Sequence, residues 1–550
     1  MIDPFGRHLT RYVNELREML SPPDPTARPG IAGLRGPDLA TFLFTTAAVT
    51  MLAWLAFESI RLGILSIGYP YQLENYGEGV VLNQARRLLS GLTLYPANVD
   101  PPYLATTYTP AYHFLVCVIE RLFLHNLLAA GRFLSVTYTA LTAVVIFLLV
   151  REMALETDAR SPFVWLGALL AAFGFLSSEN VIRWGPLMRI DIQAYFFSFL
   201  GLLVFFNTQP PSPKAYASLV PLVFAIFTRQ TAVASLVACT IVSLFNWPKF
   251  GIRYALFAAA GIIFSYCAVA LWEKHFWFQA VLLNLVQEMS WKDWWLMWRD
   301  KVLMPHLIFM LVAALYLFWA LGLSPRRSWR IWTGCIYALL AFFTTFGAGK
   351  VGSAINYYLE HIGSFFILTG AFVSTVLAGM ATPANRRSLR WIAVLTAFGL
   401  AFNASCTIWL FPSKTHRHRV KILEQHSVWE DERRMEDLLR KTPEPVLSTE
   451  AVLLDRTGHL FYFEPFILKQ MVIKGYWNEE IILERVRHRE FHLIVLPMST
   501  YMGRKNPSIL LTSEFISTVA QNYRLVLHTR AGWAYAPLPI EAQHPFFHSR

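Results

Sequence analysis

The sequence predicts a polytopic α-helical membrane protein of about eleven spans with a small C-terminal α/β domain. Three observations carry this prediction. Of the 550 residues, 55% are hydrophobic and only 15% are charged, and the mean hydropathy of +0.40 is too high for a soluble protein. Apolar runs such as those from Leu39 and Ile331 reach the ~18 residues needed to cross a bilayer. Hydropathy falls after Ser413, which indicates a separate domain.

The apolar segments can be placed one by one along the chain. Spans are expected to start near Leu39, Gly131, Pro162, Ile192, Ile252, Met304, Arg330, His361 and Leu389. A further apolar block, Ala215 to Phe245, is long for one span and just long enough for two short ones. Because Arg229 and Gln230 interrupt this block, we expect it to cross twice, which gives about eleven spans in all.

One segment, Thr109 to Leu124, is too short and too polar for an ordinary span, because it contains His113 and an adjacent Glu-Arg pair. We expect an interfacial or re-entrant helix there. The opposite pair of choices, in which this segment crosses and the Ala215 block crosses once, gives the same count but turns Arg183 to Asp191 toward the cytoplasm. Loop charges in this part of the chain do not separate the two topologies.

The formal charge of +12 is concentrated in short loops between apolar runs, such as SPRRSWR (Ser324 to Arg330) and NRRSLR (Asn385 to Arg390). This positive-inside pattern places both loops and the N-terminal tail, residues 1–38, in the cytoplasm. It is favoured over nucleic-acid binding as the explanation of the charge. The five cysteines lie in apolar segments without metal-ligand spacing, so no zinc site or disulfide framework is expected.

Two parts of the chain are expected outside the bilayer. The transmembrane module covers residues 39–412, and residues 413–550 form an extracytoplasmic α/β domain, because short apolar strands there alternate with charged helical patterns. The expected strands are His492 to Pro497 and Tyr523 to His528. The first outer loop, residues 68–124, is large.

Shorter elements are expected at the surface of the same side. The first outer loop contains a probable amphipathic helix from Val80 to Gly91. Further outer loops are expected at residues 179–191, 273–303 and 348–360. The loop 273–303 is rich in Trp, as expected for helices that lie at the membrane interface.

The first outer loop contains NYGEG (Asn75 to Gly79), an acidic residue between two glycines before the predicted helix. The flexible turn places Glu78 at a helix N-terminus, a position that suits a base. A helix-capping acid would occupy the same position, so position alone leaves both roles open. Glu74 is the second candidate base.

The pattern around Glu78 resembles the first outer loop of the GT-C glycosyltransferases, membrane enzymes that use polyprenyl-phosphate sugars. It comprises the acid-bearing turn, a helix ending in LLSGLTLY, then PPY and YTPAYHF before the next apolar helix. It is most similar to the bacterial branch of lipid A aminoarabinose transferases, protein O-mannosyltransferase-like proteins and rhizobial lipopolysaccharide galacturonosyltransferases. The resemblance implies that Glu78 is the catalytic base. Gly77 stands where relatives often have a second acid, so no metal is indicated and no cofactor is required.

Further segments resemble the same family: RWGPLMRID (183–191), FTRQTA (227–232) and GKVGSAINYYLE (349–360). The stretch from Pro445 looks like the soluble domain of many bacterial members. The resemblance implies that RWGPLMRID and the Thr109 segment lie on the outer side, which selects the first of the two topologies.

A polyprenyl-phosphate donor keeps its tail in lipid and its phosphate at the headgroup level, so its site requires cations at the outer end of the bundle. The basic residues expected there are Arg189, Lys350, Arg183 and Arg229. Their alternative role is snorkelling at helix ends, and Arg189 could instead pair with Asp191. Candidate sugar or acceptor contacts, which could equally be interface anchors or packing residues, are Asp191, Tyr108, His113, Asn356, Tyr357 and Glu360.

The expected function is transfer of a sugar from a polyprenyl-phosphate donor to a glycan, lipid or protein by an inverting displacement. The protein is expected in the inner (plasma) membrane with its site on the extracytoplasmic side. GAGKVGS does not fit the P-loop spacing, so no nucleotide site is expected. Two alternatives stay open: a transporter or flippase, whose sites usually lie near the midplane, and a lipid-linked oligosaccharide ligase or polymerase.

Overall fold

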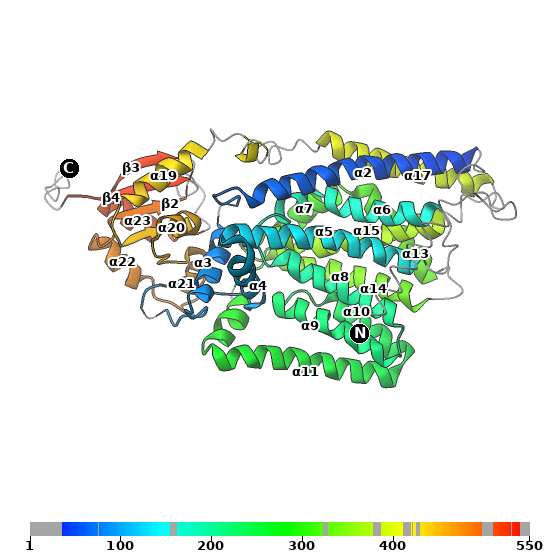
Figure 1. Ribbon diagram of the computed structural model, residues 1–550, viewed down its shortest axis with the longest axis horizontal. Helices are drawn as coiled ribbons and strands as arrows, with labels where there is room; N and C mark the ends of the chain where they lie inside the picture. The colour runs from blue at the N-terminus through cyan, green and yellow to red at the C-terminus, as the bar shows by residue number, and fades with distance from the viewer. Residues whose placement is uncertain are drawn as a thin grey trace.

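The computed structural model describes residues 36–74, 76–98, 100–154, 162–285, 287–322, 328–377, 387–410, 420, 422–424, 429–497, 510–529 and 531–539. It is a long helical bundle that carries a smaller α/β domain at one end (Figure 1). Residues 1–35 of the N-terminal tail and Asn75 lie outside the described residues, as do parts of the two basic loops and of the expected C-terminal domain.

The expected apolar segments are helical. The helices are α2 (Pro37–Ile67), α5 (Leu127–Met153), α6 (Pro162–Ser177), α8 (Asp191–Thr208), α9 (Leu219–Thr228), α10 (Ala234–Asn246), α11 (Pro248–Trp272), α13 (Leu307–Gly322), α14 (Trp329–Thr344), α15 (Leu359–Phe372) and α17 (Arg387–Leu410). Among the described residues, 7 helices are long and apolar enough to cross a membrane, or up to 8 if one bent pair is a single span. The multi-pass class is confirmed, and the count of eleven stays a prediction.

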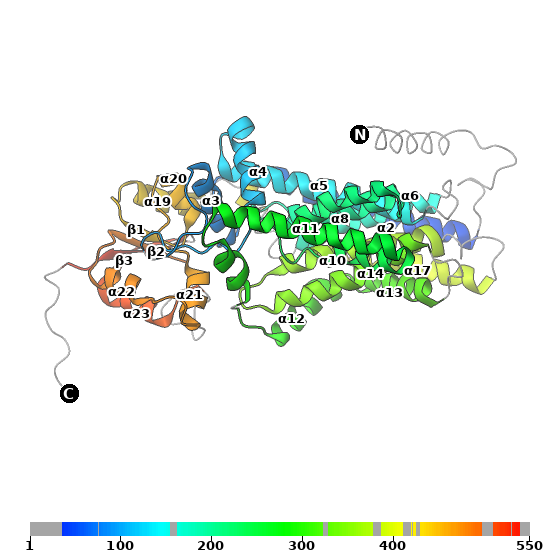
Figure 2. The same ribbon diagram turned by 90° about the horizontal axis from the view of Figure 1, so that it is seen from below.

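The two ambiguous segments adopt the expected local structures. The Ala215 block forms η3 (Pro213–Ser218) with α9, then α10, and the chain becomes extended at Arg229 between them. The Thr109 segment forms only a short helix, α4 (Ala111–Ile119), with a π-helical turn η2 (Glu120–Leu124). Helix α4 lies beside α3 (Gly77–Leu89) at the domain end of the bundle (Figure 2).

Helix α3 begins earlier than the sequence predicted. The predicted start was Val80, whereas the helix starts at Gly77 and ends at Leu89. Glu78 therefore lies inside the first turn rather than before the helix, and it makes no capping bond of the N-cap type. Its carboxylate is directed away from the helix terminus, with consequences for its role.

The Trp-rich segment forms short helical pieces at the domain end: η4 (Trp277–Leu282), η5 (Leu283–Leu285), α12 (Trp291–Trp298) and η6 (Arg299–Leu303). The α12–η6 piece meets α13 at an angle of 95°. Trp294 and Trp298 stack with ring centroids 6.1 Å apart and contact Phe342 of α14. Such crosswise Trp-bearing helices are typical of the membrane interface.

Helix α15 forms the centre of the bundle. In the span formed with its flanking turns η8 (Ile355–Tyr358) and η9 (Val373–Leu377), 89% of the residues of an 18-residue apolar window are buried, whereas the corresponding share for α11 at the periphery is 17%. Small residues allow α15 to approach α6 closely, because a Cβ at Gly370 would lie 2.5 Å from the Gly167 carbonyl oxygen. In lipid, such close backbone packing replaces the hydrophobic drive available in water.

The C-terminal domain is built on a mixed four-stranded sheet of order β1-β2-β4-β3. Its strands are β1 (Val446–Ser448), β2 (Leu493–Leu496), β3 (Tyr523–Thr529) and β4 (Gly532–Pro537). Strand β1 pairs parallel to β2, and β4 pairs antiparallel to both β2 and β3. The helices are α19 (Glu430–Arg440), α20 (Ala451–Thr457), α21 (Pro465–Ile473), α22 (Glu480–Arg487) and α23 (Ser513–Asn522). The predicted α/β fold class is confirmed.

The two faces of this sheet bury different partners. Ile494 and Leu496 of β2 pack with α21 to α23, whereas Leu493 and Val495 face α19 and α20. The core on the α19 and α20 face also contains Leu62 of α2 and residues of the first loop. The domain therefore shares a core with the end of the bundle, next to the cavity described below.

We predict that Gly370→Ala destabilises the protein by about 1–3 kcal/mol, because the new Cβ would overlap the Gly167 carbonyl. Thermal unfolding of the purified protein in detergent measures this. Gly399→Ala is the matched control, because its Cβ would meet Ile308 at an ordinary contact distance of 3.4 Å. Equal unfolding temperatures for both variants would contradict the close approach of α6 and α15.

Candidate active site

A cavity of about 490 Å³ lies at the junction between the bundle and the C-terminal domain. It is bounded by the first loop, the segment before α8, the break between α9 and α10, the η4–η5 turn, the loop after η7 (Thr345–Gly349), and α21. The following sequence-predicted site residues line it: Glu74, Tyr108, Arg189, Arg229, Lys350, Asn356 and Tyr357. The fold therefore brings these predicted residues together although the first and the last, Glu74 and Tyr357, are 283 positions apart in the sequence.

Glu74 and Arg189 form the charged part of the wall. The Arg189 guanidinium lies 3.7 Å from the Glu74 carboxylate, and it donates to the Tyr108 hydroxyl at 3.5 Å. It also lies over the Trp184 ring, 5.1 Å from the centroid. The absence of a side chain at Gly77 leaves room for this arrangement, because a Cβ there would overlap the Arg189 guanidinium. A carboxylate and a cation thus face the same cavity.

Lys350 approaches the cavity from the loop after α14. Its ammonium group donates to the Asn284 carbonyl oxygen at 2.8 Å, which leaves further N–H donors on the same nitrogen. The loop is tied to the Trp-rich segment by a backbone bridge between Met289 and Lys350. Lys350 is therefore held at the cavity by backbone contacts while its charge remains accessible.

Arg229 is anchored from behind by Asp191. The two side chains form an ion pair, and Asp191 also accepts hydrogen bonds from Asn356 at 2.9 Å and Trp184 at 2.7 Å. The guanidinium lies 4.2 Å from the centroid of the Tyr357 ring. Asp191 itself is buried and does not line the cavity. Its partners are three lining residues, which favours an organising role over the predicted contact with a sugar.

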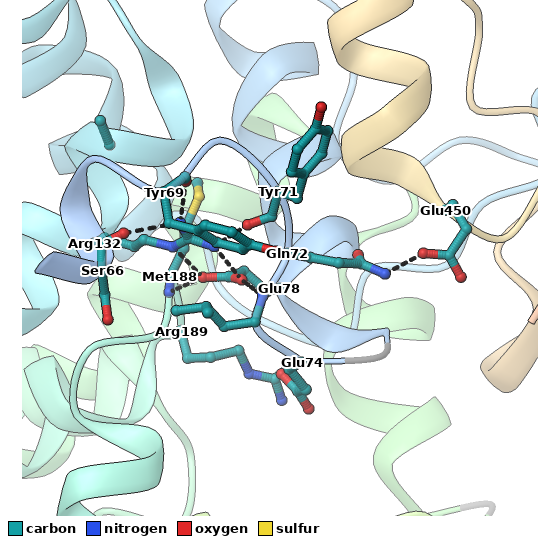
Figure 3. A network of polar contacts seen from close by, with 12 residues as sticks. Ser66, Tyr69, Tyr71, Gln72, Glu74, Glu78, Arg132, Met188, Arg189 and Glu450 are labelled. Atoms are coloured by element: carbon teal, nitrogen blue, oxygen red, sulfur yellow. Dashed lines mark hydrogen bonds and ion pairs between the residues drawn. The ribbon is translucent and has the colours of Figure 1, made fainter. Parts of the chain in front are cut away.

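Glu78 does not line the cavity. Its carboxylate is fully buried against Arg132, which donates at 2.8 Å and 2.7 Å to its two oxygens. The backbone N–H groups of Leu73 and Met188 donate to the same carboxylate at 2.9 Å and 3.0 Å. Figure 3 shows Glu78 turned toward Arg132, and Glu74 beside Arg189.

Burial alone would raise the pKa of Glu78, but the Arg132 charge and the hydrogen bonds outweigh it and hold that pKa below its usual value. A carboxylate with a lowered pKa and filled acceptor positions is a weak base, and Glu78 is not among the residues that line the cavity. This geometry favours a structural role for Glu78 over the predicted role of base. Its rival Glu74, which lines the cavity, takes that place in the proposal below.

Three other predicted site residues lie elsewhere. Arg183 pairs with Glu179 at 3.7 Å on the exposed side of α7 (Glu179–Trp184). Glu360 is buried in the bundle, where it accepts from Ser198 at 2.6 Å. His113 is buried and hydrogen-bonded to Gln84 at 2.9 Å, and burial lowers its pKa to about 4.

The physical reasons for these placements differ. Arg183 extends toward Glu179 of the same helix, whereas its neighbour Trp184 lines the cavity. Glu360 lies in the first turn of α15, about one helical turn further along the chain than the lining residue Asn356. His113 does not line the cavity, but it is hydrogen-bonded to Gln84, which does.

Sequence reasoning missed several lining residues, among them Gln84, Trp184, Asn284, Glu464 and Phe466. Gln84 and Trp184 lie within segments that had been singled out, so their polar or aromatic character was an available signal. Glu464 and Phe466 belong to the C-terminal domain, and nothing in their local pattern indicates contact with the first loop. Among the described residues, no group of three or more His, Cys, Asp or Glu side chains could hold a metal ion.

Solved structures share this architecture of bundle and end domain. ArnT from Cupriavidus metallidurans bound to undecaprenyl phosphate, an aminoarabinose transferase of the GT-C class, matches with a TM-score of 0.57 and 12% identity, over 90% of this chain and 99% of that one. The chain has the GT-C fold. Apo ArnT matches this chain with a TM-score of 0.55 and 12% identity, over 89% of this chain and 98% of that one.

An oligosaccharyltransferase from Archaeoglobus fulgidus also shares the GT-C fold. It matches with a TM-score of 0.50 and 13% identity, over 89% of this chain and 74% of that one. No family model and no curated protein matches the sequence. The predicted GT-C resemblance is thus confirmed at the level of fold.

We predict that Glu78→Gln lowers the free energy of unfolding by about 3–5 kcal/mol, because it leaves the buried Arg132 charge without its counter-ion. Unfolding of the full-length protein in detergent measures the effect. Glu480→Gln, which removes an exposed carboxylate of the C-terminal domain, is the control and should unfold like the wild type. A Glu78→Gln protein of wild-type stability that had lost only its catalysis would restore Glu78 as the base.

Proposed function

We propose that this protein is an integral-membrane glycosyltransferase that moves a sugar from a polyprenyl-phosphate donor to a hydroxyl of a glycan, lipid or protein acceptor. One observation carries the proposal: in a GT-C bundle, a carboxylate (Glu74) and two cations (Arg189 and Lys350) line a single cavity at the bundle end. The reaction needs those three groups: a base, and positive charge where the phosphate departs.

The donor phosphate is held by Arg189 and Lys350 in this proposal. Arg189 offers a planar fork that can bind two phosphate oxygens, and Lys350 adds a point charge from the opposite loop. The Trp-bearing helix α12 beside the Lys350 loop indicates the level of the membrane interface, where a lipid phosphate lies. ArnT, which matches over 90% of this chain, is described with bound undecaprenyl phosphate, and this likeness supports the choice of donor.

Glu74 acts as the general base. It takes the proton from the acceptor hydroxyl as that oxygen attacks the anomeric carbon on the face opposite the phosphate. The bond between the anomeric carbon and the phosphate oxygen breaks, and its electron pair stays on the phosphate. Arg189 and Lys350 stabilise the charge that grows there. A single displacement inverts the anomeric configuration, and no step requires a metal.

The cavity faces the extracytoplasmic side in this proposal. Arg387 and Arg390 begin α17 at the end of the bundle remote from the C-terminal domain, and Arg390 binds Asp38 at the start of α2 with two hydrogen bonds of 2.9 Å. Arg330 lies at the start of α14, whose other end leads to Lys350. Basic residues at one end of the bundle favour the cytoplasm for that end.

We predict that Glu74→Gln slows sugar transfer by about 10²–10⁴-fold with little change in the KM for the donor, because the base is lost while the phosphate contacts remain. The assay supplies purified protein in nanodiscs with a panel of polyprenyl-phosphate sugars and membrane-derived acceptors. Glu480→Gln serves as the control variant. Wild-type turnover by Glu74→Gln would remove Glu74 from the mechanism.

We predict that Lys350→Met lowers kcat/KM for the donor by about 10²-fold, because one charge on the departing phosphate is lost. Lys249→Met, at an exposed position on α11, is the matched control and should behave as wild type. Movement of a lipid or sugar across vesicles without donor consumption by the wild type would favour a transporter instead.

A further inference from the structure

We propose that the C-terminal domain is a positioning part of the active site: Glu450 and Phe466 hold the chain on both sides of Glu74, at Gln72 and at Tyr76. This inference rests on the proposed function, because it concerns the placement of the base in that reaction. It assigns a role to the domain beyond covering the cavity.

Glu450 holds the N-terminal side of the segment. Its carboxyl group accepts a hydrogen bond from the Gln72 side-chain amide, as Figure 3 shows. Glu450 is 6% exposed and precedes α20, and burial raises its pKa to about 8. The hydrogen bond from Gln72 is the side-chain contact that offsets this burial. A buried carboxyl group requires such a hydrogen-bonding partner, so Gln72 and Glu450 hold one another in place.

Gly79 allows this contact by letting α20 approach α3. A Cβ at Gly79 would lie 3.0 Å from the Gln72 side-chain oxygen and 3.2 Å from the Ala451 Cβ. Val452, the next residue of α20, packs in the same apolar core as Val81 and Ala85 of α3. The start of α20 is therefore seated directly on the helix that follows Glu74.

Phe466 holds the C-terminal side of the segment. Its backbone N–H donates to the Tyr76 hydroxyl at 3.4 Å. Its ring packs against Gly352, whose φ of +81° and lack of a Cβ provide the necessary space. Because Gly352 lies two residues after Lys350, the same side chain also supports the loop of the second phosphate cation. Phe466 therefore contacts both loops that carry the proposed chemistry.

The rest of the domain is docked by contacts that do not involve Glu450 or Phe466. Arg86 of α3 binds Asp455 of α20 with two hydrogen bonds of 2.7 Å and 3.0 Å. Tyr71 donates to Glu436 at 3.0 Å, and Tyr103 pairs with the chain at Phe463 as in a parallel strand. Loss of Glu450 should therefore loosen the Glu74 segment without releasing the domain.

The expected effect is on the chemical step. Misplacement of a base by about 1 Å can cost on the order of 10²-fold in rate. Glu450→Ala removes the acceptor of Gln72, and Tyr76→Phe removes the hydroxyl that accepts from the Phe466 backbone N–H, whereas both leave the Phe466 ring that supports the Lys350 loop. Both variants should therefore lower kcat by about tenfold or more and leave the KM for the donor within about twofold. Glu450→Gln keeps an acceptor for Gln72 and should restore most of the rate.

The experiment compares the wild type with Glu450→Ala, Glu450→Gln, Tyr76→Phe and the exposed control Glu480→Ala, all as full-length protein in nanodiscs. Steady-state kinetics are measured together with amide hydrogen exchange of peptides covering residues 70–80. We expect faster exchange of these peptides in the two disruptive variants, wild-type exchange in Glu450→Gln and the control, and unchanged exchange in the central helix α15. Faster exchange throughout the chain in Glu450→Ala would mean global unfolding, and Tyr76→Phe then decides the outcome.

The outcomes separate the inference from the proposed function. If the wild type transfers sugar and Glu74→Gln does not, while Glu450→Ala and Tyr76→Phe match the wild type in kcat and exchange, the positioning role is overturned and the function stands. An equal rate loss in Glu450→Gln and Glu450→Ala would also overturn it, because the hydrogen bond to Gln72 would then be irrelevant. If the wild type consumes no donor, the proposed function fails, and the inference fails with it.

Discussion

The buried ion pair between Arg132 and Glu78 is the interaction on which the rest of this site depends. All the N–H donors of the guanidinium are used: it donates to both oxygens of Glu78 and to the carbonyl oxygens of Ser66, Tyr69 and Tyr71. A buried ion pair stabilises a fold only when its remaining hydrogen-bonding positions are filled, and here the structure fills them. The pair joins the end of α2, the first turn of α3 and the spanning helix α5 at one point.

Two carboxylates of the same loop consequently have different roles. Glu78 accepts from the backbone of Leu73 and Met188, which directly precede Glu74 and Arg189. The buried acid thus fixes the backbone on which the proposed base and the proposed phosphate ligand are carried. Glu74, at the cavity wall, keeps access to a substrate, and the C-terminal domain supports its segment from the other side. Environment, more than residue type, separates the structural acid from the reactive one.

Much of the fold followed from the sequence, because hydrophobic length and period are local properties. The break at Arg229, the short helix near His113 and two strands of the end domain, β2 and β3, were predicted from such patterns. The site was predicted less well, since spacing along the chain does not give the direction of a side chain: a start of α3 at Gly77 turned Glu78 inward. Its partner Arg132 lies inside an apolar run, where its sequence pattern gave no sign of a role. The contribution of Phe466 depends on docking between segments nearly 400 positions apart, about which local patterns carry no information.

The central claim is that Glu74 faces the reacting atoms while Glu78 stays bound to Arg132. A cryo-electron microscopy structure of the protein in nanodiscs, with a non-transferable phosphonate analogue of a polyprenyl-phosphate sugar, tests this most directly. We predict the phosphonate within hydrogen-bond distance, about 2.7–3.2 Å, of Arg189 and Lys350, with Glu74 facing the anomeric carbon and the Arg132–Glu78 pair intact. An analogue whose anomeric carbon faces Glu78, released from Arg132, or whose phosphonate binds away from both cations, would contradict the account.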